Sequence, residues 1–361
     1  MTNFTKTFNK KKVFLTGHTG FKGSWMCVWL QMMGAEVKGY SLKPEKKSLH
    51  NKIKSQLNID SVIADIRDKK RLKKEILSFQ PDFIFHLAAQ PLVRESYIIP
   101  VETFETNIIG TANILNSLRF LKKKCVCLIV TTDKVYKNLE INYTYKESDK
   151  LGGYDPYSAS KAAVEIITES FRLSFFNPEE FLKHKKIIAS ARSGNVIGGG
   201  DYAKDRIVPD IFHSLLKSEP VHVRNPEAVR PWQHVLDPLQ GYLTLAAAMN
   251  KEPVKFATSY NFGPALNDTC TVVELVQLAI KNWRSGKFII SKQKKAPHEA
   301  GLLMLNIEKA KKELGWRPEW SCDVAIEKTI SWYKKSLNRN CNILDLCKED
   351  IREYLAANQK K

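Results

Sequence analysis

The stretch Thr16-Gly17-His18-Thr19-Gly20-Phe21-Lys22-Gly23 decides the fold class, because it joins the apolar run 13–15 to an amphipathic helical pattern over 21–32. Three glycines, at 17, 20 and 23, permit a tight turn, close approach of a pyrophosphate to the backbone, and close packing of the helix on the strand. The N–H groups at the start of the helix then attract the anion. The stretch predicts a dinucleotide-binding strand–turn–helix unit; the alternative is an ordinary turn between strand and helix.

Short apolar runs alternate with helical patterns as far as residue 191. We expect strands at 13–15, 37–42, 62–66, 83–87, 125–131 and 187–191, and further helices at 68–79, 101–121 and 156–176. Apolar strands separated by helices are typical of a parallel sheet covered on both faces. The sequence therefore predicts an α/β fold with a doubly wound parallel sheet of the Rossmann type.

The sequence pattern changes after about residue 192, where glycine and proline become frequent and the predicted elements become shorter. Helical patterns return at 236–249, 271–283, 306–314 and 322–337. We expect residues 8–191, with about 229–250, to form a dinucleotide-binding domain. Residues 192–228 and 251–337 are expected to form a smaller, interleaved α/β domain that binds substrate. Residues 338–361 are predicted to be a helical C-terminal extension, to which the sequence assigns no role.

The composition excludes several classes of protein. Of the 361 residues 43% are hydrophobic, which excludes a wholly disordered chain. No apolar run approaches the ~20 residues of a membrane span, and the first residues lack the pattern of a signal peptide. The seven cysteines are odd in number and form no CxxC pair, so we expect no disulfide framework, no metal site and a reducing, cytoplasmic location.

The net charge of +19 (57 Lys and Arg, 38 Asp and Glu) raises nucleic-acid binding as an alternative of a different class. Lysine supplies 44 of these cations in small scattered groups, whereas arginine, which reads bases better, supplies 13. No nucleic-acid-binding motif accompanies them. We therefore expect a solvated, lysine-rich surface and no nucleic-acid or membrane partner.

A second motif is Tyr157-Ser158-Ala159-Ser160-Lys161, whose tyrosine and lysine are four residues apart and share a helix face. An ammonium near a phenol favours the phenolate and lowers its pKa. Tyr157 is therefore a candidate base near neutral pH; the alternative is a surface pair.

Together these two motifs resemble the extended short-chain dehydrogenase/reductase superfamily. Four further stretches, 65–68 (DIRD), 86–90 (HLAAQ), 106–111 (TNIIGT) and 131–136 (TTDKVY), resemble the nucleotide-sugar 4,6-dehydratases. Residues 17–25, 230–236 and 297–300 are most similar to the CDP-glucose 4,6-dehydratases. The resemblance covers roughly residues 10–335.

The resemblance implies a lyase that converts CDP-glucose to CDP-4-keto-6-deoxyglucose and water, with NAD as an internally recycled cofactor. Oxidation at C4 is followed by elimination across C5 and C6 and return of the hydride to C6. The product would feed deoxysugar synthesis, such as that of lipopolysaccharide O-antigen. The alternatives are a dehydratase or 4-epimerase for another nucleotide sugar, or an inactive NAD-sensing relative. Asp133 and Lys134 favour elimination.

The resemblance also implies catalytic roles. Tyr157 would take the O4 proton, with Thr132 hydrogen-bonded to O4 beside it, and Asp133 would protonate the departing C6 hydroxyl. Many relatives carry a glutamate as the C5 base where this chain has Lys134. Lys134 is the candidate for that base, with a positioned water as the alternative.

For the cofactor, the resemblance implies that Lys161 binds the nicotinamide ribose, Asp65 accepts from the adenine amino group and Ile66 lies against the ring. His18 and Lys22 either touch the phosphates or are solvated. Residues 39–43 carry no acidic side chain to hold a ribose hydroxyl, so the choice of NAD over NADP rests on the resemblance. The remaining implied cofactor residues are Gly17, Gly20, Phe21, Gly23, Leu87, Ala88, Ala89, Gln90, Asn107, Thr131 and Tyr157.

For the substrate, Asn195, Arg206 and Arg230 are the implied diphosphate ligands, since a guanidinium matches phosphate oxygens. His234 is a further candidate, although a lone histidine is more often structural. His298 and Glu299 are placed near the nucleotide or sugar. The helices expected at 101–121 and 156–176 would pair with those of a second copy in a homodimer or a dimer of dimers.

Overall fold

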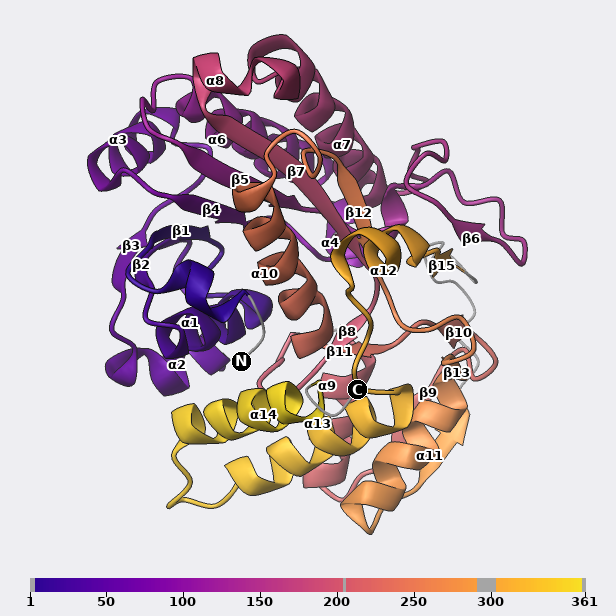
Figure 1. Cartoon of the computed structure of the whole chain (residues 1–361). Helices are drawn as coiled ribbons and strands as arrows, with labels where there is room; N and C mark the ends of the chain where they lie inside the picture. The colour runs from indigo at the N-terminus through magenta and orange to yellow at the C-terminus, as the bar shows by residue number, and fades with distance from the viewer. Residues whose placement is uncertain (1–3, 204–205, 291–302, 359–361) are drawn as a thin grey trace.

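The computed structural model describes residues 4–203, 206–290 and 303–358. Its centre is a seven-stranded parallel sheet in the order β12-β7-β5-β4-β1-β2-β3 (Figure 1). The strands are β1 Lys12–Thr16, β2 Glu36–Ser41, β3 Asp60–Ile63, β4 Phe83–His86, β5 Cys125–Val130, β7 Lys186–Ser193 and β12 Ser259–Phe262. The strand order reverses between β1 and β4, where α/β sheets of this kind bind ligands at the carboxyl ends of their strands. The predicted fold class is confirmed.

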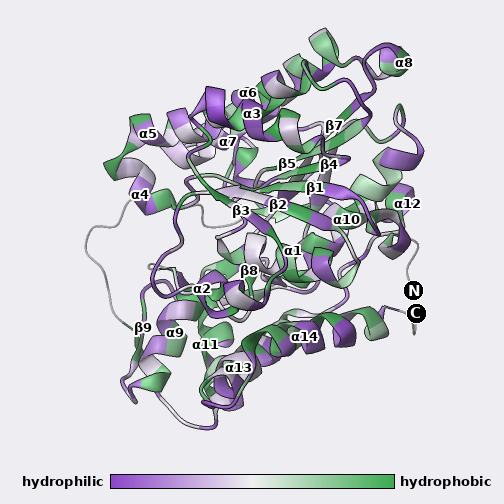
Figure 2. Ribbon diagram, turned by 90° about the vertical axis from the view of Figure 1, so that its left-hand side faces the viewer, coloured by the Kyte–Doolittle hydropathy of each residue, from purple (hydrophilic) through white to green (hydrophobic). Residues whose placement is uncertain are grey.

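Helices cover both faces of the sheet. On one face lie α3 (Lys69–Phe79), α6 (Gly110–Leu118) and α7 (Pro156–Phe175); on the other lie α1 (Phe21–Met32) and α10 (Leu236–Lys251). The apolar side chains of β5 divide between the two: Cys125, Cys127 and Ile129 join the first layer, and their alternating neighbours the second. Both faces of the strand are therefore buried, as its unbroken apolar sequence requires. Figure 2 shows these strands as an apolar band between the helices.

Most of the elements that follow β7 in the chain lie below the sheet in Figure 1. Helix α11 (Val272–Trp283) packs against α13 (Cys322–Ser336) and α9 (Ile207–Leu216). Short two-stranded ladders border these helices: β8 (Val196–Ile197) with β11 (Gln233–His234), β9 (Val221–Val223) with β14 (Phe288–Ile290), and β10 (Val229–Arg230) with β13 (Cys270–Thr271). A further ladder pairs β6 (Thr144–Tyr145) with β15 (Met304–Leu305), close to α12 (Glu308–Leu314).

One sequence expectation about elements requires correction, and a second is confirmed with an irregular turn inside the helix. Strand β12 falls in the range expected to belong to the second domain, yet it pairs in parallel with β7 and forms one edge of the central sheet. The helix expected at 101–121 consists of α5 (Pro100–Phe104), a π-helical turn η3 (Glu105–Ile109) and α6. The wider turn contains Asn107, and such turns often mark functional sites.

The C-terminal extension forms helix α14 (Ile343–Ala357), which packs against α1, α13 and the short helix α2 (Leu49–Ile53). The Tyr354 hydroxyl donates to Asp237 Oδ1 at 2.8 Å, and the Tyr354 ring meets Trp29 edge-on at 5.9 Å. The extension therefore covers the apolar outer side of α1.

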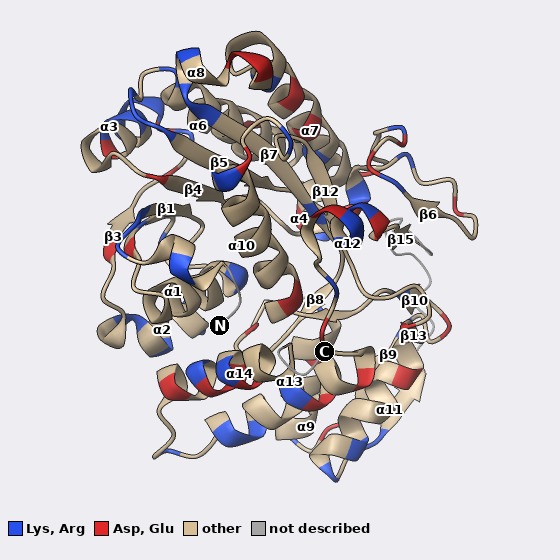
Figure 3. Cartoon of the chain, viewed as in Figure 1, with Lys and Arg blue, Asp and Glu red and all other residues tan. Residues whose placement is uncertain are grey.

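Within the described ranges no helix is both long enough and apolar enough to cross a membrane. The same residues contain no cluster of three or more His, Cys, Asp or Glu side chains that could hold a metal ion. Lysine and arginine are spread over many elements (Figure 3).

Candidate active site

The glycine turn lies between β1 and α1, at the point where the strand order reverses. Gly17 has φ +76°, a conformation that side chains rarely adopt. A Cβ at Gly23 would lie 2.0 Å from the carbonyl oxygen of Gly17, so helix and turn touch directly. The N-cap residue Gly20 supplies no side-chain cap to the first N–H groups of α1. The turn therefore fits an anionic group at the helix N-terminus.

The loop after β4 lies beside this turn and is held by Asn107. The Asn107 side-chain amide accepts from the Gln90 N–H at 2.8 Å and donates to the Gln90 carbonyl at 3.1 Å and to Ser160 Oγ at 2.8 Å. In this structure the Asn107 amide holds the Gln90 loop against α7, and its direct contact with a cofactor stays a prediction. Ala88 N–H donates to Thr16 Oγ1 at 3.2 Å, which brings residues 87–90 against the glycine turn.

The end of β3 carries Asp65 and Ile66. Asp65 receives Arg67 Nη2 at 2.7 Å; burial opposes its charge, but hydrogen bonds from Arg67 outweigh this and lower the pKa of the carboxyl group. Ile66 packs against Gly110, where a Cβ would lie 2.4 Å from the Ile66 side chain. Both residues follow β3, and their contact with an adenine stays a prediction.

The catalytic candidates meet at the carboxyl end of β5. The short helix η4 (Asp133–Val135) begins there, and Asp133 Oδ1 accepts from Thr132 Oγ1 at 2.8 Å and from Lys134 Nζ at 3.1 Å. The Asp133 carboxylate is buried and the Lys134 side chain is about one quarter exposed. Tyr157, in the first turn of α7, is close enough to Thr132 for a hydrogen bond. The structure therefore brings these four predicted residues together.

The expected effect of Lys161 on Tyr157 is not observed. Burial raises the pKa of Tyr157 to about 12, against the opposing influence of the Thr132 hydrogen bond and the Arg206 charge. Lys161 instead donates to the Val130 carbonyl at 3.1 Å, and burial lowers the pKa of its amine to about 8. The role of Lys161 in making Tyr157 a base near neutral pH stays a prediction; in this structure the amine is turned toward β5 and burial opposes the phenolate.

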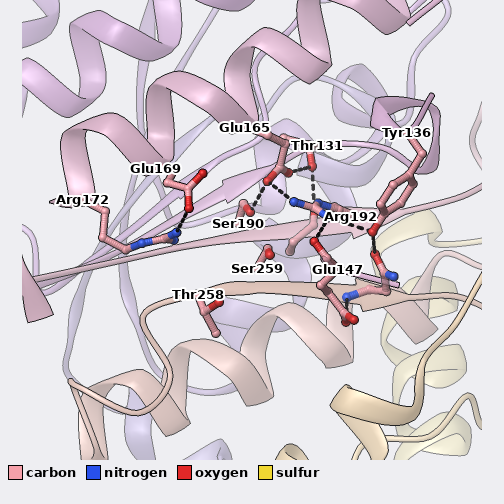
Figure 4. A network of polar contacts seen from close by, with 12 residues as sticks. Thr131, Tyr136, Glu147, Glu165, Glu169, Arg172, Ser190, Arg192, Thr258 and Ser259 are labelled. Carbon is pink, nitrogen blue, oxygen red and sulfur yellow. Dashed lines mark hydrogen bonds and ion pairs between the residues drawn. The ribbon is translucent and has the colours of Figure 1, made fainter. Parts of the chain in front are cut away.

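A buried network, shown in Figure 4, fixes α7 against the sheet. Glu165 lies one turn after Lys161; its Oε2 accepts from Arg192 Nη2 at 2.9 Å and from Ser190 Oγ at 2.6 Å. Arg192 also donates to the Tyr136 hydroxyl at 2.7 Å. The Thr131 hydroxyl donates to Glu165, and its contact with a cofactor stays a prediction.

Sequence reasoning missed Glu165 and Arg192. The available signals were local: Glu165 continues the helix face of Tyr157 and Lys161, and Arg192 is a charge within an apolar strand. A charge in such a position needs a buried partner.

Two histidines expected near phosphates are structural. His18 is buried, with its ring against Gly39 and its Nε2 2.7 Å from Ser61 Oγ, and burial lowers its pKa to about 4. His234 is buried with its ring edge-on to Trp320 at 4.7 Å, and burial lowers its pKa to about 3. Both rings are therefore neutral near pH 7, and neither supplies charge to a diphosphate.

Lys22 is directed into the site rather than toward solvent or the turn. Its Nζ donates to Ser193 Oγ at 2.9 Å and to the Tyr242 hydroxyl at 3.3 Å. The solvated alternative for Lys22 is therefore wrong, and its contact with a phosphate stays a prediction.

Among the substrate candidates that the structure describes, Arg206 has a charge that acts on this centre, and Asn195 follows Gly194, where a Cβ would lie 3.2 Å from Asp133 Oδ2. Arg206 pairs with Asp201 at 2.8 Å, and its charge lowers the pKa of both Tyr157 and Lys22. Asn195 joins β8 to β11 through its carbonyl, which accepts from Gln233 N–H at 3.0 Å. Arg230 belongs to the β10–β13 ladder and donates to the Val229 carbonyl at 3.2 Å. His298 and Glu299 lie outside the described residues.

Comparisons with known proteins agree with this geometry. Residues 14–329 match the family described as GDP-mannose 4,6 dehydratase. The chain is 43% identical to CDP-glucose 4,6-dehydratase of Salmonella typhimurium, over 96% of this chain and 97% of that protein. It is 26% identical to a probable dTDP-glucose 4,6-dehydratase of Sinorhizobium fredii, over 89% of this chain and 92% of that one.

Solved structures share the fold at lower identity. The dTDP-glucose 4,6-dehydratase of Bacillus anthracis in complex with NAD matches with a TM-score of 0.75 and 22% identity, over 91% of this chain and 98% of that chain. The UDP-glucose 4-epimerase of Thermotoga maritima with UDP-glucose matches with a TM-score of 0.76 and 23% identity, over 91% of this chain and all of that one. On the extent of the family match and of the 43% identity, the chain belongs to the GDP-mannose 4,6-dehydratase family within the short-chain dehydrogenase/reductases.

Proposed function

We propose that this protein is an NAD-dependent lyase that dehydrates CDP-glucose to CDP-4-keto-6-deoxyglucose. The observation that carries the proposal is the buried Asp133 carboxylate, paired with Lys134 beside Tyr157, because oxidation at C4 alone requires neither an acid nor an amine there. The 43% identity to a CDP-glucose 4,6-dehydratase supports the choice of nucleotide.

The residues at the switch point fit a dinucleotide. The glycine turn would hold the pyrophosphate, Asp65 and Ile66 the adenine, and Lys161 the nicotinamide ribose, with residues 87–90 held in place by Asn107. When bound, NAD supplies a hydride acceptor for C4 and, later, the hydride donor for C6.

At C4, the Tyr157 oxygen takes the hydroxyl proton while the Thr132 hydroxyl orients the sugar oxygen. Because burial opposes the phenolate, Tyr157 depends on the neighbouring hydrogen bond and on the positive charge of Arg206. The Glu165–Arg192 network keeps α7 and β5 in register, which fixes the distance between Tyr157 and Thr132.

Elimination uses the Asp133–Lys134 pair. Transfer of one proton from Lys134 Nζ to Asp133 across their 3.1 Å contact produces a neutral amine and a neutral acid together. The amine then takes the C5 proton, whose acidity the 4-ketone has increased, and the acid protonates the departing C6 hydroxyl to release water. The pair is then ammonium and carboxylate again. When C6 has received the hydride, the Lys134 ammonium returns a proton to C5. Tyr157 releases the O4 proton to solvent and Lys134 takes one up, so each turnover restores the starting state. Lys134 is accordingly the proposed C5 base.

Arg206 and Asn195 are proposed to hold the substrate diphosphate. In the described part of the site, the charge of Arg206 acts on Tyr157. The Arg206 guanidinium is held by an ion pair with Asp201. Arg230, on the separate β10–β13 ladder, would contact the distal part of the nucleotide sugar.

The proposed assembly is a homodimer formed through α5, η3 and α7. Large apolar side chains are exposed on these elements: Val101 is 63%, Ile109 52%, Ile166 57% and Leu173 58% exposed. A second copy that packs its own helices here would bury them. Ile166→Glu should convert the dimer to a monomer in light scattering; an unchanged mass would place the interface elsewhere.

A reducing, cytoplasmic location is proposed from the seven cysteines, none of which forms a disulfide. The product would serve deoxysugar synthesis, including that of lipopolysaccharide O-antigen.

The function is tested by incubating the purified protein with NAD and, separately, CDP-, dTDP-, GDP- and UDP-glucose. Mass spectrometry should detect loss of one water from CDP-glucose at the highest kcat/KM. A product from another nucleotide alone would assign a different substrate, and no dehydration of any of them would refute the proposal.

Two variants test the assigned roles. Tyr157→Phe should abolish turnover while the affinity for NAD is retained, whereas Tyr154→Phe, at a tyrosine 78% exposed, should leave turnover intact. Asp133→Asn should allow the 4-ketone to form without loss of water. Normal dehydration by either active-site variant would remove that residue from the mechanism.

A further inference from the structure

Cys270 and Cys322 are separated by 52 positions in the sequence, but their sulfur atoms are in contact. Cys270 belongs to strand β13, and Cys322 is the first residue of helix α13. The two Sγ atoms lie 2.8 Å apart, within hydrogen-bond distance of each other. Both residues are free cysteines and both are buried. The proposed mechanism uses neither of them.

The backbone on each side of this thiol pair is held by other contacts. Cys270 pairs with Arg230 in the β10–β13 ladder. The Cys322 N–H donates to both carboxylate oxygens of Asp268, at 2.9 and 3.0 Å, and the Ser321 side chain caps the start of α13. A disulfide bond is about 2.05 Å long, so the two sulfur atoms need to approach by less than about 1 Å to form one.

A cavity of about 430 Å³ leads to one of the two sulfurs. In the described part of the chain its lining includes Cys270, but not Cys322, together with Glu274 and Lys281 of α11 and Asp323 of α13. A hydroperoxide is uncharged, so the two carboxylates of the lining do not repel it. A small oxidant in the cavity therefore meets Cys270 first.

We propose that Cys270 and Cys322 form a reversible oxidation site that takes a hydroperoxide as its oxidant. The Cys270 sulfur attacks hydrogen peroxide, the O–O bond breaks, and a sulfenic acid and one water form. The Cys322 sulfur then attacks the Cys270 sulfur. The S–S bond forms, the S–O bond breaks, and the departing hydroxide leaves as a second water with the Cys322 proton. In total the two thiols lose two electrons and two protons, and the peroxide is reduced to two waters.

The two thiols differ in a way that suits these two steps. The contact with Cys270, followed by burial, raises the pKa of the Cys322 thiol. Cys322 therefore keeps its proton until the second step, in which that proton leaves with the hydroxide. In a reducing compartment both residues remain thiols until an oxidant arrives, and thiol reductants reverse the bond afterwards.

The disulfide would join β13 to the start of α13 and close a loop of 52 residues. A cross-link of this length lowers the conformational entropy of the unfolded chain. The oxidised protein should accordingly melt about 5 °C higher than the reduced protein. Helix α13 also packs against α11 and β11, so the added bond stabilises the group of elements below the sheet.

The test treats the purified full chain with hydrogen peroxide, blocks the remaining thiols with iodoacetamide and digests the protein with trypsin without reduction. Mass spectrometry should detect peptides 256–281 and 313–328 linked to each other and two hydrogen atoms lighter than their sum. Circular dichroism melts of the treated protein should show the gain of about 5 °C, and dithiothreitol should remove it.

Two variants separate this site from other cysteines. Cys322→Ala keeps Cys270 at the cavity but removes its partner, so peroxide should not raise the melting temperature. Cys341→Ala is the matched control, because Cys341 is a free cysteine that is more exposed than either member of the pair. This variant should show the same gain as the native protein.

The proposal is overturned if the linked peptides are absent after oxidation, or if Cys322→Ala shows the native gain. A gain that disappears in Cys341→Ala would assign the bond to Cys341 and would also overturn it. Should Cys322→Ala not fold, the peptide map of the native protein decides alone. The site does not depend on the proposed function, since none of these measurements uses a nucleotide sugar.

Discussion

Replacement of Arg192 by methionine isolates the contribution of the buried network beneath the catalytic centre. Arg192 and Glu165 are each only 4% exposed, and the guanidinium also holds the Tyr136 hydroxyl and the Glu147 carbonyl. Removing one partner of a buried ion pair leaves an uncompensated charge and costs about 3–5 kcal/mol. With an unfolding entropy of about 2.1 cal/mol/K per residue, each kcal/mol lowers the melting temperature of a chain of 361 residues by about 1.3 °C. We therefore expect Arg192→Met to melt about 4–7 °C lower at pH 8.

The loss of stability caused by Arg192→Met should be smaller in mild acid, and the direction of this pH dependence follows from the protonation of Glu165. Burial opposes its charge, but in the native protein Arg192 outweighs burial and lowers the pKa of the carboxyl group. Without Arg192 burial dominates, so the pKa of the folded variant lies above that of the unfolded chain. Between these two pKa values the folded variant binds one more proton at Glu165 than the unfolded chain does. Its free energy of unfolding therefore falls as the pH rises through this interval. The difference in melting temperature from the native protein should accordingly be smaller at pH 5 than at pH 8.

Circular dichroism melts at the two pH values measure this effect. Arg172→Met is the control, because Arg172 faces the exposed Glu169 at 3.8 Å and its pair should contribute below about 1 kcal/mol. The double variant Glu165→Gln/Arg192→Met, which buries no charge, should regain most of the loss. A fall of less than about 1 °C at pH 8, or an equal fall at both pH values, would refute the reasoning.

Three further predictions concern positions around the site. Gly23→Ala should abolish NAD binding in calorimetry, because its Cβ would lie 2.0 Å from the Gly17 oxygen, whereas Gly152→Ala, with contacts no closer than 3.4 Å, should bind normally. Asn107→Ala should weaken NAD binding by about tenfold with the melting temperature little changed, because the Gln90 loop loses two hydrogen bonds and the link from Asn107 to Ser160 is lost; unchanged affinity would contradict a role of Asn107 in holding this loop. Burial raises the pKa of Asp237 to about 7, so native stability should fall as the pH rises from about 4 toward 7, and Asp237→Asn should flatten that dependence in melts; an equal slope would exclude Asp237 as its source.

The fold and the membership of the catalytic cluster could be predicted because their signals are local. The glycines at 17, 20 and 23 act through neighbouring backbone, and the alternating apolar runs report which strands are covered on both faces. Residues 132–134 follow a parallel strand, and Tyr157 lies in the first turn of the next long helix. Both are therefore expected at the carboxyl edge of the sheet, where the carboxyl ends of parallel strands meet. Strand β12 could not be predicted as part of the central sheet. Its four residues follow the region of glycine- and proline-rich segments, and only pairing with β7 defines the strand.

What the sequence alone determined is the succession of elements and the identity of the groups at the carboxyl edge of the sheet, because periodicity and turn chemistry depend on residues close together in the chain. Only the tertiary structure decided how those groups behave. Burial, which sets the pKa values of Tyr157, Lys161 and Lys22, depends on segments distant in sequence. The direction of the Lys22 side chain is likewise set by hydroxyls 171 and 220 positions away along the chain. A glycine-turn lysine thus faces the catalytic centre because α10 and β7 close over α1, a contact that no local pattern encodes.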